Sequence, residues 1–315
     1  MNKKDLRVID AHCDTLYELD VQKTSLYTND LHVSLERLLE YGGYVQVFAT
    51  WVDDTPENPM QRCMHLIDVF YDELRQNEKH LQLVLSAKDL RDSLYSGKVG
   101  ALLSVENGRV LEHSIHNLYA LYARGVRAMT LTWNGINEIA CGASCQEDTG
   151  LSAFGREVVQ EMNRLGMLVD VSHLSIKSFW DVIAQSTLPV MASHSNAYSV
   201  AMHERNLSDR QIQAMIQTNG FIGLTIYPLF LAGCKQASMR DFFKHCDYML
   251  AMGAENNIGL GSDFDGISVL PEGMTSACDY ECLCYKMKEH GYTETLIKKI
   301  THENFLRYAD QVLKG

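Results

Sequence analysis

Short apolar runs alternate with amphipathic stretches along most of the chain. The runs are rich in Val, Ile, Leu and Ala and predict strands that are buried on both faces. Between them apolar residues recur at helical spacing, as with Ile67, Phe70 and Leu74. The predicted strands cover residues 8–11, 44–52, 99–105, 128–132, 168–172, 190–193, 221–226 and 258–261. The predicted helices cover residues 34–41, 60–77, 87–95, 115–123, 155–165, 176–184, 208–218 and 239–252, with two or three more before the C-terminus.

A helix or a long connecting segment separates each predicted strand from the next, which is the order of a parallel sheet. Eight such units predict a closed (β/α)8 TIM-type barrel, an α/β fold that here forms a single domain over residues 1–315. The stretch before residue 34 is expected to be irregular, and the apolar run 81–85 is left without a role. A doubly wound open sheet is the alternative, disfavoured because no Gly-x-Gly-x-x-Gly turn follows an early strand.

The composition is that of a globular protein with an acidic surface. Hydrophobic residues make up 46% of the chain, charged residues 22%, and the formal net charge is -12. This charge argues against a nucleic-acid or membrane partner, since either would need clustered Lys and Arg. No apolar signal segment opens the sequence, and no run approaches the ~18 apolar residues of a membrane span. We therefore expect a cytoplasmic protein whose nine cysteines are reduced.

His12 and Asp14 stand where the first predicted strand ends. Residues two apart in an extended segment point the same way, so the imidazole and the carboxylate can converge on one point. Both are ligands that zinc and other borderline divalent ions take. A His-x-Asp pair is nevertheless common by chance, and the interpretation depends on the rest of the chain.

Other predicted strands end in the same kind of residue. Glu106 follows the third strand, His173 the fifth, His194 the sixth and Asp263 the eighth. Barrel enzymes collect their catalytic groups at the carboxyl ends of the strands, so all six side chains are expected to face one mouth. A pair of divalent cations would supply the counter-charge that buried carboxylates need. Taken singly, the histidine of the fifth strand could be a hydrogen-bonded core residue and the glutamate a helix cap.

Six ordered motifs extend this pattern over nearly the whole chain. They are IDAHCD (9–14), SVENG (104–108), NRLGM (163–167) leading into VDVSH (169–173), ASHS (192–195), RNLSD (205–209) and GLGSDFDG (259–266). Together they resemble the membrane (renal) dipeptidase family, from residue 8 to Phe305-Leu306-Arg307. The resemblance implies a binuclear zinc dipeptidase on a barrel of the amidohydrolase type, with a small dipeptide as substrate, and a homodimer.

Roles follow from the resemblance, motif by motif. One zinc ion would be held by His12 and Asp14, the other by His173 and His194, with Glu106 bridging the two. The resemblance also implies that Asp263 acts as general acid and base beside the first ion, and that Arg205 and Tyr227 line the substrate site. Substrates would include dipeptides with a D-residue on the C-terminal side.

Ordinary chemistry agrees with two of these roles. A carboxylate such as Asp263 can take a proton from the attacking water and pass it to the leaving amine, with His203 as the next candidate for that task. The planar fork of Arg205 suits a bidentate clamp on the carboxylate of a short peptide. The alternative for this arginine is a surface ion pair with Glu204 or Asp209, the commoner fate of Arg.

The chain departs from the family at the end of the fourth strand. Well-studied animal members read Leu-Thr-His there, and that histidine contacts the substrate near the developing oxyanion, whereas this chain reads Leu131-Thr132-Trp133-Asn134. We expect the Trp133 indole to narrow the pocket towards small side chains, with Asn134 as a candidate amide donor. The alternative is that Trp133 only packs under the barrel rim.

Two further functions are compatible with a metal-binding barrel. An amidohydrolase acting on a cyclic amide or an aminated base is disfavoured, because such sites usually open with His-x-His rather than with His12-x-Asp14. A catalytically silent barrel kept as a binding protein is disfavoured because all six metal-type residues are present.

Overall fold

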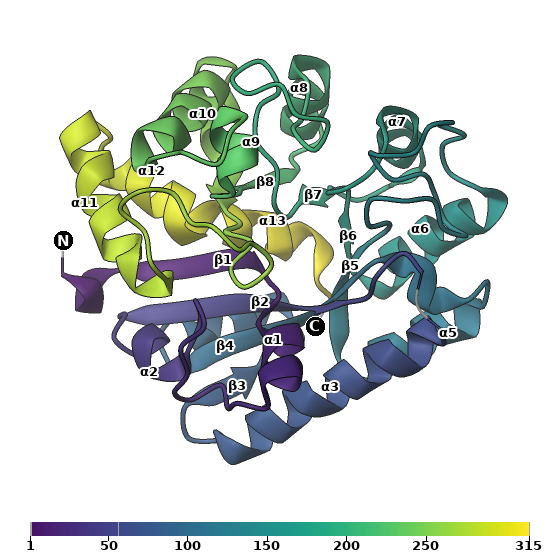
Figure 1. The fold of residues 1–315 in the computed structure, drawn as a ribbon, viewed down its shortest axis with the longest axis horizontal. Helices are drawn as coiled ribbons and strands as arrows, with labels where there is room; N and C mark the ends of the chain where they lie inside the picture. Colours follow the sequence, from purple (N-terminus) through teal and green to yellow (C-terminus); the bar gives the residue numbers. More distant parts are fainter. Residues whose placement is uncertain (1, 56, 315) are drawn as a thin grey trace.

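The strands of this computed structural model, which describes residues 2–55 and 57–314, all run parallel. Eight of them close into a barrel in the order β1, β2, β4, β5, β6, β7, β8, β9, with Asp10 of β1 paired to Leu260 of β9. Figure 1 shows the helices arranged around these strands. The strands are β1 (Arg7–Cys13), β2 (Gly43–Trp51), β3 (Leu81–Leu83), β4 (Val99–Glu106), β5 (Val126–Thr130), β6 (Leu168–Asp170), β7 (Met191–Ala192), β8 (Phe221–Leu224) and β9 (Ile258–Leu260).

The predicted barrel is confirmed, and its eight strands are the eight that the sequence pattern predicts. The apolar run at 81–85 forms the short strand β3, which pairs with the beginning of β4, Leu81 against Val99. Further along the same side of β4, Ser104 pairs with Ala128 of β5. Strand β3 is therefore an additional short strand that pairs with β4 ahead of β5, and it is not one of the eight barrel strands.

The helices of the described residues fall largely where amphipathic spacing predicts them. They are α1 (Thr15–Gln22), α2 (Leu35–Leu38), α3 (Pro59–Gln76), α4 (Ala87–Ser93), α5 (Ile115–Ala123), α6 (Ala153–Leu165), α7 (Ile176–Gln185), α8 (Asp209–Gln217), α9 (Pro228–Ala232), α10 (Met239–Ala251), α11 (Tyr280–His290), α12 (Glu294–Lys298) and α13 (Asn304–Val312). None of them combines the length and apolar character needed to cross a membrane.

Helix α1 corrects the expectation of an irregular stretch after the first strand. It buries only Leu16 and Leu19 as large apolar side chains, and Val21 is exposed. Two apolar residues three apart are too few to show a helical period in the sequence. Asp14 occupies the N-cap position, so the start of this helix also places a predicted metal ligand.

The barrel is filled from within and closed at its amino end. Ile9, Val45 and Leu102 belong to an apolar cluster that lies inside the strands, and Phe305 of α13 joins it with its ring 5.0 Å from that of Phe221. A second apolar cluster packs the outer faces of the strands against the helices. Because one end is sealed by side chains, a cavity can open only at the carboxyl ends of the strands.

Two glycines let the backbone at the ends of β7, β8 and β9 approach closely at that open end. A Cβ atom on Gly261 would lie 1.8 Å from the carbonyl oxygen of Ser193, and one on Gly223 would lie 2.0 Å from the same oxygen. Glycine within a strand marks such a close approach of backbone. The residue after this serine is His194, so the spacing of the strands also fixes a predicted metal ligand.

Substituting Gly261→Ala should therefore destabilise the barrel by about 1–3 kcal/mol or more, because neither backbone can retreat without breaking the sheet. Thermal unfolding measures the loss. Gly97→Ala is the control, since a Cβ there meets nothing within 4 Å and only its positive φ of 75° opposes the change. Equal losses in the two variants would contradict the packing argument.

Candidate metal centre

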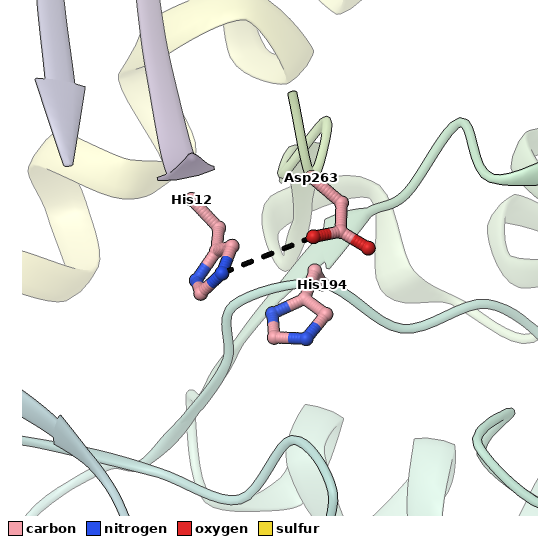
Figure 2. Close-up of side chains that lie close together, drawn as sticks. All are labelled: His12, His194 and Asp263. Atoms are coloured by element: carbon pink, nitrogen blue, oxygen red, sulfur yellow. Dashed lines mark ion pairs between the residues drawn. The ribbon is translucent and has the colours of Figure 1, made fainter. Parts of the chain in front are cut away.

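The six residues predicted at the strand ends come together at the mouth of the barrel. Glu106 is the last residue of β4, and the others lie at or within three residues of the ends of β1, β6, β7 and β9. Figure 2 shows His12, His194 and Asp263 with their side chains pointing towards one another, although His12 comes from β1 and the other two from the segments that follow β7 and β9. Three groups of ligand atoms lie within 4.8 Å of one another: His12, Asp14 and Glu106; Glu106, His173 and His194; and His12, His194 and Asp263.

Glu106 lies between two sets of ligands, His12 with Asp14 on one side and His173 with His194 on the other. Its Oε2 lies 3.4 Å from Nε2 of His12, which in turn lies 3.4 Å from a carboxylate oxygen of Asp14. Its Oε1 lies 2.9 Å from Nε2 of His173 and 3.8 Å from Nε2 of His194. One carboxylate thus presents one oxygen to each set, which is the geometry of a bridging ligand.

His173 and His194 are both arranged as neutral ligands. Their Nε2 atoms lie 2.8 Å apart, and burial lowers the pKa of each imidazole well below its usual range. The other ring nitrogens are engaged: Nδ1 of His173 lies 2.9 Å from the side-chain oxygen of Asn134, and Nδ1 of His194 lies 2.8 Å from the hydroxyl of Ser193. An Nδ1–H that donates outward leaves the Nε2 lone pair for a metal ion.

Unpaired buried atoms give a second sign that the site fits a cation. Nε2 of His12 and Oδ1 of Asp14 have no hydrogen-bond partner among the described residues, and the 3.4 Å contacts of this histidine lack hydrogen-bond geometry. Leaving polar groups buried and unpaired is costly. Imidazole nitrogens and carboxylate oxygens in this number and spacing suit a borderline divalent ion, which would satisfy them.

The backbone is also unusual at two of these positions. His173 and Asp263 adopt φ angles of 69° and 68°, in the left-handed region that side chains other than Gly rarely occupy. Such conformations cost of order 1–3 kcal/mol and gather at functional sites, where the surrounding structure imposes them. Burial also raises the pKa of the Asp263 carboxyl well above its usual range.

A cavity of about 500 Å³ opens over this cluster. It is lined by five of the six predicted cluster residues and by all four residues predicted to contact substrate: Arg205, Tyr227, Trp133 and Asn134. His203, the fallback proton carrier, does not line it; its Nδ1 accepts the backbone N–H of Arg205, and its ring packs on Phe230. The tertiary structure therefore brings the predicted substrate residues to the same opening as the cluster.

Arg205 does not lie on the surface, so its interpretation as a surface ion pair is wrong. Its side chain is buried (6% exposed) and its Nε and Nη2 have no hydrogen-bond partner among the described residues. Glu204 instead accepts a hydrogen bond from Ser144. Burial lowers the pKa of the guanidinium to about 10, so it keeps its charge at neutral pH. The residue lines the cavity, and a guanidinium with unpaired donors suits a carboxylate.

Trp133 and Asn134 turn out to do different things. The Trp133 indole lines the cavity and packs edge-on against Trp51, with ring centroids 5.2 Å apart, so it is not merely hidden under the rim. The Asn134 oxygen accepts from His173, which gives this residue a part in orienting a predicted ligand. That role was not indicated by the sequence.

Several cavity residues were missed by the sequence analysis. Tyr17 lies on the unpredicted helix α1, with its ring 5.0 Å from that of Trp51. Trp51 is the last residue of β2, so its position at a strand end is the signal in the sequence that points to it. Phe230, on the short helix α9, and Ile267 also line the cavity.

A closed (β/α)8 barrel that carries imidazole and carboxylate groups around a cavity at its carboxyl end defines a barrel enzyme of the metal-dependent class. The chain belongs to the membrane dipeptidase family (peptidase family M19), whose model matches residues 3–314. It is thus a metal-dependent dipeptidase, as the motif resemblance implied.

Solved structures of similar proteins agree with this membership. The dipeptidase AC, a metallo peptidase of family M19, is 26% identical with a TM-score of 0.92, and the match covers 98% of this chain and 99% of that one. A metallo peptidase from Rhodobacter sphaeroides, solved with a phosphinate mimic of the dipeptide L-Ala-D-Ala, is 24% identical with a TM-score of 0.90 over 98% and 99% of the chains. An amidohydrolase from Pseudomonas aeruginosa is 25% identical with a TM-score of 0.86 over 99% and 98%.

Proposed function

We propose that this protein is a binuclear zinc dipeptidase that hydrolyses small dipeptides, including those with a D-residue at the C-terminal position. The observation that carries the proposal is the placement of Glu106, whose two oxygens face two separate sets of ligand atoms. One ion would be held by His12 and Asp14, the other by His173 and His194. Two such ions supply an acidified water and a polarised carbonyl when bound.

The remaining steps belong to the protein's own residues. The Asp263 carboxylate lines the cavity with Oδ1 3.9 Å from Nε2 of His12, within reach of a water held at the centre. It would accept the proton of the attacking water and return it to the leaving amine. Arg205 would hold the free carboxylate of the substrate through its two unpaired N–H groups. The proposed D-residue draws support from the bound L-Ala-D-Ala mimic in the Rhodobacter sphaeroides neighbour.

Other functions are less well supported. A silent binding barrel would not need six ligand-type side chains gathered at one cavity with buried atoms left unpaired. An amidohydrolase reaction on a cyclic amide or an aminated base is less well supported because such sites usually open with His-x-His rather than with His12-x-Asp14. The homodimer and the cytoplasmic location remain predictions.

The metal content is tested with Glu106→Gln. We expect two zinc ions per wild-type chain, and the loss of at least one in the variant, because an amide offers one oxygen and turns its NH2 towards the second cation. Elemental analysis of protein purified without chelator and reconstituted with zinc measures both. Glu78→Gln, on the exposed surface, is the matched control. A wild-type protein that reproducibly retains no transition metal would sink the proposal.

The activity is tested with a panel of L,L and L,D dipeptides on protein of known metal content, with Asp263→Asn beside the wild type. The wild type should hydrolyse small members of the panel. The variant should keep its metal ions and lose turnover by ~10² to 10⁴, the range ascribed to a positioned general acid and base. Near wild-type activity in Asp263→Asn would assign proton transfer to another group, and no hydrolysis by the wild type would refute the dipeptidase assignment.

Side-chain preference is tested with Trp133→Ala on the same panel. We expect kcat/KM for dipeptides with large side chains to improve relative to that for Ala and Gly dipeptides, because the indole that lines the cavity is removed. Trp180→Ala, on the outer helix α7, controls for the loss of a tryptophan elsewhere. Equal losses across the panel would instead indicate a donor or packing role for Trp133.

A further inference from the structure

Two buried aspartates on opposite sides of the barrel make the same set of hydrogen bonds. Asp10 lies on β1 and Asp170 ends β6, and three strands separate these in either direction around the barrel. Oδ1 of Asp170 accepts from the backbone N–H groups of Ser172 and Ser193, both at 2.9 Å. Oδ2 of Asp170 accepts from the hydroxyl of Ser193 at 2.5 Å and from that of Thr130 at 2.6 Å.

The other aspartate repeats this arrangement around Ser262. Oδ1 of Asp10 accepts from the backbone of His12 at 3.3 Å and of Ser262 at 3.0 Å, and its Oδ2 accepts from the hydroxyl of Ser262 and the phenol of Tyr280, both at 2.6 Å. In each case the serine on the neighbouring strand directly precedes a residue of the cluster, Asp263 or His194. The shared arrangement ties two strand ends together where the ligands begin.

Only the Asp170 arrangement reaches an imidazole ring. The Ser193 hydroxyl lies 2.8 Å from Nδ1 of His194. A carboxylate accepts and cannot donate, so this hydroxyl must give its proton to Asp170. It can then only accept from the histidine, which places a proton on Nδ1 and leaves Nε2 as a lone pair towards Glu106. The neighbouring ligand, His173, has its Nδ1 engaged separately by Asn134.

We propose that Asp170 is a positioning residue that sets the tautomer of His194 through Ser193 and so presents its Nε2 to the ion shared with His173. The proposal rests on the metal centre of the proposed function. Asp170 itself touches neither that ion nor the substrate. Its counterpart Asp10 holds backbone in the same way but has no imidazole in its hydrogen-bond set, so it serves as an internal control.

Replacing Asp170 by asparagine should reverse the direction of the hydrogen bonds from His194 through Ser193 to residue 170. The amide would turn its oxygen to the two backbone N–H groups, because NH2 facing two donors is excluded, and its NH2 would then face Ser193 and Thr130. Ser193 would accept from the amide and donate its own proton to Nδ1 of His194. The ring would then carry its proton on Nε2, where it blocks metal binding.

The experiment compares zinc-loaded wild type with Asp170→Asn, Ser193→Ala, Thr130→Val and Asp10→Asn. Zinc retained per chain is measured across a series of zinc buffers, and the ring-nitrogen shifts of 15N-labelled histidines are followed along the same series. We expect Asp170→Asn to lower the affinity for one zinc ion by about 10- to 100-fold, the range for removing the hydrogen-bond partner of a metal-bound histidine. Its His194 should shift to the Nε2–H tautomer, with a smaller loss of affinity in Ser193→Ala.

The controls separate positioning from simple stability. Thr130→Val removes a different donor to Asp170, and Asp10→Asn disturbs an equally buried carboxylate, yet both should keep the Nδ1–H tautomer and the ion at His173 and His194. Wild-type zinc binding and tautomer in Asp170→Asn, or losses in all variants that follow their melting temperatures, would overturn the proposal. Ser193→Ala carries the same test if Asp170→Asn does not fold. A wild type that binds no zinc would refute the proposed function. The role of Asp170 would still be decided by the tautomer of His194, which is measured independently of zinc.

Discussion

Three carboxylates within reach of one another, Asp14 and Glu106 buried and Asp263 mostly so, are the constraint on which the site depends. Burial, and then the charge of Glu106, raise the pKa of Asp14 to about 6, and Asp263 lies close enough to share the same repulsion. Such a cluster is costly unless positive charge is supplied in place. A divalent cation supplies it most compactly. The same charges that are unfavourable without a cation therefore favour metal binding, and they would couple it to the stability of the barrel mouth.

The barrel holds these side chains in place largely by fixing the backbone that carries them. Strand spacing at Gly261, left-handed backbone at His173 and Asp263, and the aspartate that bonds to consecutive strand ends each limit where a ligand atom can lie. His173 and His194 also each have a hydrogen-bond partner for Nδ1, the ring nitrogen that points away from the cluster. Precision at the centre thus comes from the backbone and from hydrogen-bond partners that are not themselves metal ligands.

The cavity is lined by one positively charged group and by a separate set of aromatic side chains. Arg205 contributes a buried positive charge beside Phe230, whereas Tyr17, Trp51 and Trp133 form an aromatic wall joined by edge-on contacts. A small molecule with a carboxylate at one end and a compact side chain at the other matches this division. The metal cluster lies in the same cavity, so the bond to be broken would lie within reach of it.

The sequence by itself determined the barrel and the cluster. Buried parallel strands leave apolar runs of distinct length, and ligands at their ends, such as His12 and Glu106, are local to those runs. It did not determine helix α1, whose two buried leucines give no period, or the buried state of Arg205, which depends on how the loop after β7 folds over the mouth. Nor could it reveal that Asn134 and Asp170 serve the histidines. Those contacts join residues 39 and 23 positions apart, and only the parallel pairing of β5 with β6 and of β6 with β7 brings them within hydrogen-bond distance.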